Sequence, residues 1–194
     1  MVILITGASC VGKTFISQKL LEKYKIPYFS LDHLKMGIYR SNNNCGFTPE
    51  SSDNIITEKL WPIIKEIIKT NIENNQNIII EGCYFPDSIE DIEKEYLEEI
   101  IIFCIVFSEQ YIQNNLLTKI FGNRGTIECK GEDIIILNKE QYILENKNRK
   151  EKCIKNKVKY FEIYEDYEDE IKSIYHWVEE EINTKNNNAR PYFA

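Results

Sequence analysis

The sequence predicts an α/β fold in which one parallel β-sheet is wrapped by helices. Short apolar runs alternate with longer amphipathic segments along most of the chain, which is the pattern of βαβ units. A glycine-containing stretch follows the first apolar run and opens the first amphipathic segment. The length of 194 residues suits one domain of ordinary size.

Each element is predicted from its own local pattern. The apolar runs predict strands at residues 2–6, 27–31, 77–81, 100–107 and 159–163. The amphipathic segments predict helices at residues 13–24, 32–39, 53–73, 88–96, 109–121, 139–156 and 167–182. Two polar stretches that contain glycine, residues 41–52 and 122–138, interrupt the alternation. We therefore expect a single domain over residues 1–184 and a flexible tail over residues 185–194.

Composition and charge argue against several classes of protein. No apolar run approaches the roughly 18 residues of a membrane span, and the N-terminus begins with a strand instead of a basic signal peptide. We therefore expect a cytoplasmic protein without membrane contact. The net charge of −7 and the lack of a basic stripe argue against nucleic acid as the main partner. The six scattered cysteines contain no CxxC pair, which favours free thiols. Nothing in the composition indicates an oligomeric state.

The glycine-containing stretch GASCVGKT matches the phosphate-binding pattern G-x-x-x-x-G-K-S/T between a predicted strand and a predicted helix. Glycines let successive backbone N–H groups approach a phosphate at a helix N-terminus. Lys13 brings positive charge to the outer phosphates, and the Thr14 hydroxyl is a ligand for Mg²⁺. We therefore expect ATP and Mg²⁺ to bind at Gly7, Ala8, Ser9, Cys10, Val11, Gly12, Lys13 and Thr14.

Two acids stand at the ends of predicted strands. In a doubly wound sheet, ligands bind at the carboxyl ends of the strands, so Asp32 is expected to face the glycine loop. It would orient or deprotonate an attacking hydroxyl group, and a helix N-cap is the alternative role. Glu81 ends the third strand and is expected to support the metal or the acceptor. An ordinary strand-end acid is the alternative for Glu81.

Cationic side chains suggest how an acceptor and the phosphates could be held. Lys35 and Arg40 follow Asp32 in the same predicted helix and are candidates for holding an anionic acceptor. The acceptor-side helices are expected at about residues 32–74, and a lid at about residues 122–150. Arg124 and Arg149 border the irregular segment and are expected to close over the phosphates as catalytic groups. Solvated surface charge remains the alternative for all four cations.

Four segments in this order, GASCVGKT, SLDHLKMGIYR, IIIEGCYFP and KIFGNRG, resemble the adenylate-kinase-like branch of P-loop kinases. The resemblance includes small bacterial proteins described as 2-phosphoglycerate kinase-like or adenylate-kinase-like. It implies a three-layer P-loop NTPase fold with a five-stranded parallel sheet in the strand order 2-3-1-4-5. It also implies an ATP·Mg²⁺ donor, a lid between the fourth and fifth strands, and a nucleotide contact for Lys119 at the lid entry.

The sequence departs from adenylate kinases at the acceptor side. Their acceptor helix carries the pattern D-x-x-R, whereas this chain has Asp32 followed by Lys35, and Lys119 stands where they have a lid-entry arginine. Asp32 is instead similar to the acid of kinases that phosphorylate a hydroxyl group. We therefore expect an ATP-dependent phosphotransferase acting on a small molecule. The alternatives are a nucleoside monophosphate kinase, a slow or non-catalytic ATP-binding regulator, and a kinase of polynucleotide ends.

Overall fold

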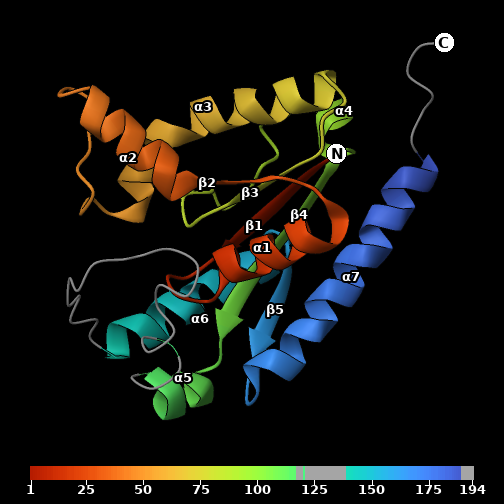
Figure 1. The fold of residues 1–194 in the computed structure, drawn as a ribbon. Helices are drawn as coiled ribbons and strands as arrows, with labels where there is room; N and C mark the ends of the chain where they lie inside the picture. Colours follow the sequence, from red (N-terminus) through yellow and green to blue (C-terminus); the bar gives the residue numbers. More distant parts are fainter. Residues whose placement is uncertain (117–119, 121–138, 189–194) are drawn as a thin grey trace.

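The strands form one parallel sheet. The structure, a computed structural model, describes residues 1–116, 120 and 139–188. The strands are β1 (Val2–Gly7), β2 (Tyr28–Ser30), β3 (Ile78–Glu81), β4 (Ile100–Phe107) and β5 (Lys159–Ile163). They pair in the order β2-β3-β1-β4-β5, and every pair is parallel (Figure 1). This arrangement confirms the predicted fold class.

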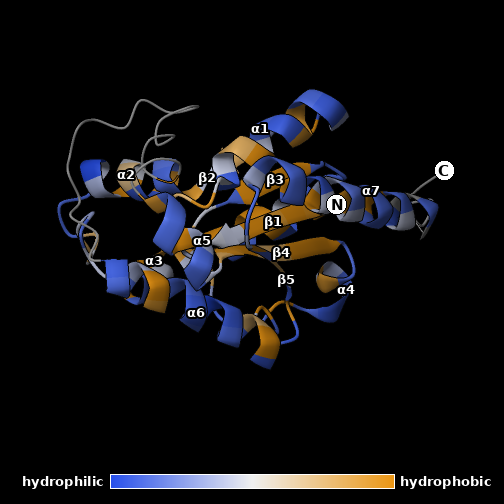
Figure 2. Cartoon of the chain, turned by 90° about the horizontal axis from the view of Figure 1, so that it is seen from below, coloured by the Kyte–Doolittle hydropathy of each residue, from blue (hydrophilic) through white to orange (hydrophobic). Residues whose placement is uncertain are grey.

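Helices cover both faces of the sheet and make three layers. They are α1 (Lys13–Tyr24), α2 (Leu31–Ser41), α3 (Asp53–Glu73), α4 (Lys94–Leu97), α5 (Glu109–Asn115), α6 (Lys139–Lys155) and α7 (Tyr167–Asn188). Helices α1 and α7 pack on one face, and α3 and α6 pack on the other. Figure 2 shows the apolar strands between these layers, with the hydrophilic sides of the helices turned outward.

Most predicted elements lie within two residues of the expected bounds, but the helix expected at residues 88–96 is wrong over most of its length. Only the short helix α4 forms there. The Ser88 hydroxyl accepts a hydrogen bond from the backbone N–H of Glu90 at 3.2 Å, so this side chain offers the backbone a turn in place of a helix. The Asp91 carboxylate is held by Trp61 of α3, whose indole N–H donates to it at 2.9 Å.

The C-terminal boundary also differs from the expectation. Helix α7 continues through Asn188, beyond the expected helix end at residue 182, so residues 185–188 are helical. The Lys185 ammonium group donates a hydrogen bond to the backbone carbonyl of Glu98, which ties this turn to the end of α4. Residues 189–194 lie outside the described residues, as do residues 122–138 of the expected lid. Its last part, residues 139–150, belongs to α6.

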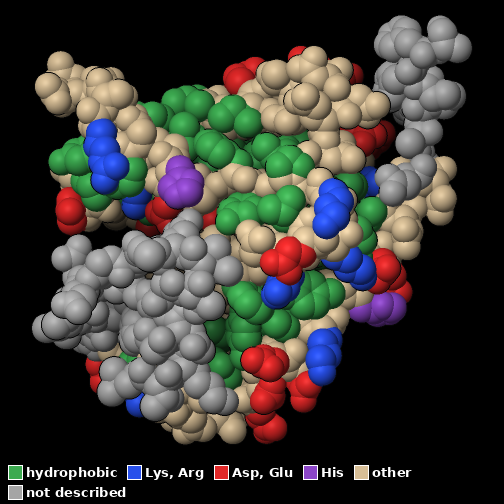
Figure 3. All heavy atoms as spheres, in the orientation of Figure 1, with side chains coloured by type: hydrophobic (Ala, Val, Ile, Leu, Met, Phe, Trp, Pro, Cys, Tyr) green, Lys and Arg blue, Asp and Glu red, His purple; other side chains and the backbone are tan. Residues whose placement is uncertain are grey.

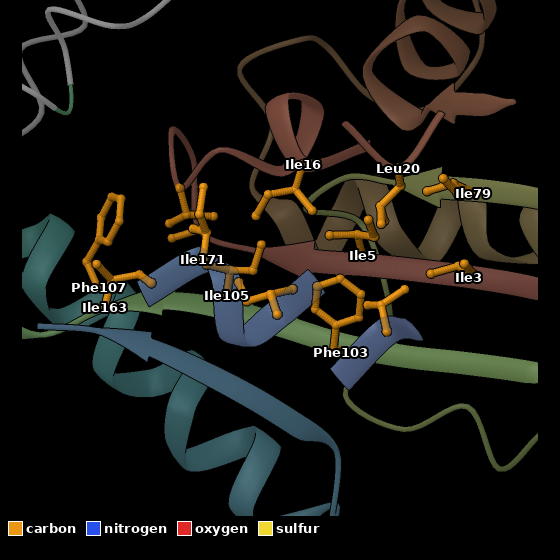
Figure 4. Packing of buried hydrophobic residues seen from close by; sticks show 14 of the residues in the cluster. Ile3, Ile5, Ile16, Leu20, Ile79, Phe103, Ile105, Phe107, Ile163 and Ile171 are labelled. Atoms are coloured by element: carbon orange, nitrogen blue, oxygen red, sulfur yellow. The ribbon is translucent and has the colours of Figure 1, made fainter. Parts of the chain in front are cut away.

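The core lies on both faces of the sheet because both faces are covered. Ile3 and Ile5 of β1 pack under α1 and α7, while Val2 and Leu4 pack under α3. All four side chains have no exposed surface. Strands buried on both sides are apolar at every position, which explains why continuous apolar runs predicted them. Figure 4 shows the first of these clusters, with Phe103 and Ile105 of β4 beneath Ile16 and Ile171.

In the described part of the chain, no helix is both long and apolar enough to cross a bilayer. Cys10, Cys45, Cys83, Cys104 and Cys153 form no disulfide, as their spacing predicts. The sixth cysteine, Cys129, lies outside the described residues.

The aromatic cluster around Phe103 should contribute strongly to stability. Phe103 is fully buried and makes edge-to-face contacts with Phe161 and Trp177, at centroid distances of 5.8 and 5.7 Å. Phe103→Ala should lower the free energy of unfolding by about 3–5 kcal/mol through lost burial and a cavity. Urea unfolding measures it. Leu144→Ala on α6, where the side chain is 55% exposed, is the control and should change stability by less than about 0.5 kcal/mol. Equal losses of stability in the two variants would contradict the importance assigned to the cluster around Phe103.

Candidate active site

The glycine loop has the backbone that phosphate binding requires. Gly7 and Gly12 have φ values of 151° and 88°, and Cys10 lies between them with φ at 61°. A Cβ on Gly7 would come within 2.4 Å of the backbone oxygen of Ile105, so only glycine fits there. Helix α1 begins immediately after Gly12 and has no side-chain cap. Its first backbone N–H groups are therefore available to an anion.

The other loop residues contribute mainly through their backbone. Ala8 and Val11 are fully buried and pack into the core under α1 and α7, whereas Ser9 is exposed. The loop is thus fixed to the sheet by two small apolar side chains. Ser9 is exposed, and Cys10 and Gly12 are partly exposed, so a phosphate chain could reach the loop at these positions.

The ammonium group of Lys13 lies within the loop. It donates hydrogen bonds to the backbone carbonyl oxygens of Ala8 at 2.7 Å and Gly7 at 3.3 Å, and to Sγ of Cys83 at 3.2 Å. Burial lowers the pKa of Lys13, but the acidic groups of Cys83 and Glu81 outweigh burial and raise this pKa above its ordinary value. Lys13 therefore carries its positive charge at neutral pH beside the loop N–H groups.

Thr14 and Glu81 form a pair of oxygen donors next to Lys13. The Thr14 hydroxyl donates to Oε1 of Glu81 at 3.2 Å, and Glu81 is only 2% exposed. Nucleotide-bound Mg²⁺ prefers oxygen ligands and takes few of them from the protein, with phosphates and water completing the shell. Among the described residues, no group of three or more His, Cys, Asp or Glu side chains could hold a metal. The pair therefore fits Mg²⁺ shared with a nucleotide, and not a metal held by protein alone.

The residues after β3 connect the glycine loop to the start of α2. Glu81 lies opposite Ile5 of β1 and Ser30 of β2 in the sheet, so the chain leaves β3 between the glycine loop and the start of α2. Gly82 packs so closely on α2 that a Cβ would meet that of Leu31 at 2.7 Å. Each residue from Glu81 to Tyr84 thus contacts a different part of the site.

Asp32 lies in a hydrogen-bonded triangle with Lys35 and Tyr84. The Lys35 ammonium group is 3.1 Å from Oδ1 of Asp32 and donates to the Tyr84 hydroxyl at 2.6 Å. The Tyr84 hydroxyl in turn donates to the same Oδ1 at 3.2 Å. Burial, followed by the Asp32 carboxylate, raises the pKa of Tyr84, so this hydroxyl keeps its proton. The cap of α2 is Ser30, which excludes the N-cap role for Asp32.

Arg149 reaches the same region from α6. It donates to the carboxylates of Asp53 at 2.5 Å and Glu145 at 3.1 Å, and to the carbonyl of Cys83 at 3.4 Å. Burial lowers the pKa of Arg149, and the acidic groups of Cys83, Glu145 and Asp53 raise it more, so the guanidinium is charged. Arg149 thus contacts Cys83, whose Sγ accepts a hydrogen bond from Lys13.

Some predicted residues are not brought to this site. Arg40 is exposed in the last turn of α2, and it makes no hydrogen bond or ion pair with another described residue. Lys119 and Arg124 lie outside the described residues. Their roles at the nucleotide and in the lid stay predictions.

Sequence reasoning missed two tyrosines that contact the loop from distant elements. The Tyr142 hydroxyl of α6 donates to the carbonyl of Ser9 at 2.5 Å, and the Tyr167 hydroxyl of α7 donates to that of Val11 at 3.3 Å. A Cβ on Gly12 would come within 1.7 Å of the Tyr167 hydroxyl. No local signal marks these tyrosines, because their contacts come from packing over more than 130 residues of sequence separation. Cys83 and Tyr84 could have been found, since they follow Glu81 directly.

Comparison with known proteins identifies the fold. No protein-family model and no curated protein matches this sequence. The shikimate kinase of Bacteroides thetaiotaomicron superposes with a TM-score of 0.55 and 14% identity, covering 92% of this chain and 98% of that one. The YorR protein of Bacillus subtilis, in complex with phosphorylated GDP, gives 0.53 and 15%, covering 94% and 98%. Deoxyadenosine kinase of M. mycoides gives 0.50 and 16%, covering 95% and 100%.

The chain therefore has the fold of the P-loop kinases. At these identities the likeness concerns the fold alone. It does not single out the adenylate-kinase-like branch, so that finer assignment stays a resemblance of four sequence segments.

The tyrosine contacts predict that the loop depends on α6 and α7. Tyr142→Phe and Tyr167→Phe each remove one hydrogen bond to a loop carbonyl, and each should weaken ATP binding by about two- to tenfold. Isothermal titration calorimetry with ATP·Mg²⁺ measures the change. Tyr175→Phe is the matched control, because the Tyr175 hydroxyl is buried without a hydrogen-bond partner among the described residues. Unchanged affinity in the first two variants would contradict a supporting role.

Proposed function

We propose that this protein is an ATP-dependent phosphotransferase that moves the γ-phosphate of ATP·Mg²⁺ to a hydroxyl group of a small molecule. One observation carries the proposal. The segment from Glu81 to Tyr84 contacts Thr14 and Lys13 on one side, and Asp32 and Lys35 on the other. A phosphate-binding loop and a carboxylate suited to an acceptor therefore share one edge of the sheet.

The donor side rests on the loop geometry. The N–H groups at the start of α1 and the charged Lys13 would bind the phosphates, and Thr14 with Glu81 would support Mg²⁺. The metal ion, when bound, would neutralise charge that develops on the phosphate oxygens. The positive charge of Arg149 acts on Lys13 and offsets part of the rise in the pKa of Lys13. While still paired with its two carboxylate partners, Arg149 would add positive charge near the transferring group.

The acceptor side rests on Asp32. Lys35 and Tyr84 hold one oxygen of its carboxylate, which fixes the orientation of the group. In the transfer, the acceptor oxygen forms a bond to the γ-phosphorus while the bond from this phosphorus to the bridging oxygen of ADP breaks. The hydroxyl proton passes to Asp32 and then to water, and ADP leaves. Asp32 would therefore act as orienting group and proton acceptor.

The other functions have less support. A kinase of polynucleotide ends needs a basic track for the backbone. On the face drawn in Figure 3, the described Lys and Arg side chains are scattered among acids and do not form a stripe. A non-catalytic regulator needs the glycine loop but not the Asp32 triangle.

The test of this function is the acceptor-dependent release of ADP from ATP·Mg²⁺. In the presence of an acceptor that stimulates the wild type, Asp32→Asn should lower turnover by about 10²- to 10⁴-fold. The affinity for ATP should change by less than about twofold, because Asp32 is not expected to contact the nucleotide. Asparagine keeps an oxygen that can accept from Tyr84 but lacks the basic carboxylate. A coupled assay measures turnover.

Two controls make the result specific. Asp169→Asn removes a carboxylate that is 73% exposed on α7 and should leave turnover unchanged. Lys13→Met should abolish tight ATP binding. If Asp32→Asn kept full acceptor-dependent turnover, the role assigned to Asp32 would be wrong.

The metal assignment has its own test. Glu81→Gln keeps a hydrogen-bond acceptor for Thr14 but removes the negative charge. The Mg²⁺ concentration that gives half-maximal turnover should rise by about 10- to 100-fold. Glu93→Gln, which removes a carboxylate paired with Lys69 at the surface, is the control and should not shift the titration. An unchanged Mg²⁺ requirement in Glu81→Gln would argue for a purely structural Glu81.

A further inference from the structure

Two mostly buried cations near Asp32 and Cys83, Lys35 and Arg149, are already paired with carboxylates. Lys35 contacts Asp32 at 3.1 Å, and its side chain is 11% exposed. Arg149 contacts Asp53 at 2.5 Å and Glu145 at 3.1 Å, with 17% of its side chain exposed. Each mostly buried cation therefore has at least one acid that neutralises it.

This pairing disfavours an acceptor that carries a negative charge. A phosphate or carboxylate that binds Lys35 would share this cation with Asp32, and one that binds Arg149 would share it with Asp53 and Glu145. Either arrangement brings the new anion close to a carboxylate. Like charges brought together at a desolvated site oppose binding strongly.

The other basic side chains do not alter this balance. Lys13 lies among the loop carbonyls on the donor side. Arg40 is exposed at the end of α2. In the sequence, residues 117–138 contain equal numbers of basic and acidic side chains, with Lys119, Arg124 and Lys130 against Glu128, Glu132 and Asp133. That segment therefore adds no net positive charge.

Tyr84 joins the triangle to an apolar cluster. Tyr84, Phe47 and Phe85 are 6%, 7% and 8% exposed and belong to the apolar cluster that includes Leu31. The Tyr84 hydroxyl is a neutral group that can exchange hydrogen bonds with an alcohol. Apolar walls with a few fixed polar groups are typical of sites for uncharged ligands.

We infer that the acceptor is an uncharged alcohol of the sugar or nucleoside class, and not a nucleoside monophosphate, a sugar phosphate or a hydroxy acid. The inference rests on the proposed function and specifies its substrate. Lys35, which the sequence suggested as a group for an anionic acceptor, then serves as a positioning residue that holds Asp32.

Three matched pairs of acceptors test this inference. Adenosine and AMP, glucose and gluconate, and glycerol and glycerate each differ by one anionic group. The release of ADP from ATP·Mg²⁺ is measured with each compound across a concentration series. The best uncharged compound should exceed its anionic partner in kcat/KM by at least about tenfold.

A variant tests the charge argument itself. Asp53→Asn removes one of the two acids that neutralise Arg149, and should shift the kcat/KM ratio toward the anionic partner by about two- to fivefold. Glu179→Gln removes an acid from the surface pair between α7 and Lys23, and should leave the ratio unchanged. An unchanged ratio in Asp53→Asn would contradict the proposed role of charge pairing.

The outcomes separate this inference from the function on which it rests. A preference for AMP, gluconate or glycerate would overturn the inference and leave the phosphotransferase intact. Binding of ATP·Mg²⁺ without stimulation by any of the six compounds would overturn both. A preference for an uncharged compound, weakened in Asp53→Asn, would support both.

Discussion

The parallel pairing of β3 with β1 and β2 determines the candidate site. This register sets Glu81 opposite Ile5 and Ser30, so the chain can leave the sheet only between the glycine loop and α2. The backbone N–H of Gly82 donates to the carbonyl of Ile5 at 3.1 Å and extends that register by one residue. A shift of one residue would turn Glu81 to the opposite face of the sheet and separate it from Thr14. The chemistry of the site thus depends on the hydrogen bonds of a short buried strand.

The buried charges at this edge are tolerated because each has a partner. An ionised group that leaves water needs compensating charge or hydrogen bonds. Lys13 finds carbonyl oxygens, Glu81 finds Thr14, and Arg149 finds two carboxylates. The fold can therefore keep several ionised side chains close together without leaving any of these buried groups unsatisfied.

The sequence predicted the parts of the molecule that depend on local pattern. The glycine loop was predicted because a backbone that approaches phosphate needs glycine at fixed positions. The end of β3 was predicted because a buried strand is a run of adjacent apolar residues. The triangle was found only in part, since Tyr84 joins Asp32 across 52 residues of sequence. The turn at Ser88 was also missed, because the apolar residues that follow it have the spacing of a helix. Contacts that arise from the packing of distant elements leave no periodic signal.

Helices α6 and α7 extend the support of the loop far beyond its motif. Tyr142 contacts the loop, and one turn later the side-chain oxygen of Asn146 accepts from the backbone N–H of Phe107 at the end of β4. Tyr167 fills the space that glycine leaves at position 12. The eight-residue loop is therefore not a self-contained module. Transplanting it into another sheet would carry over its sequence but not its shape, unless the tyrosines on both helices were transplanted with it.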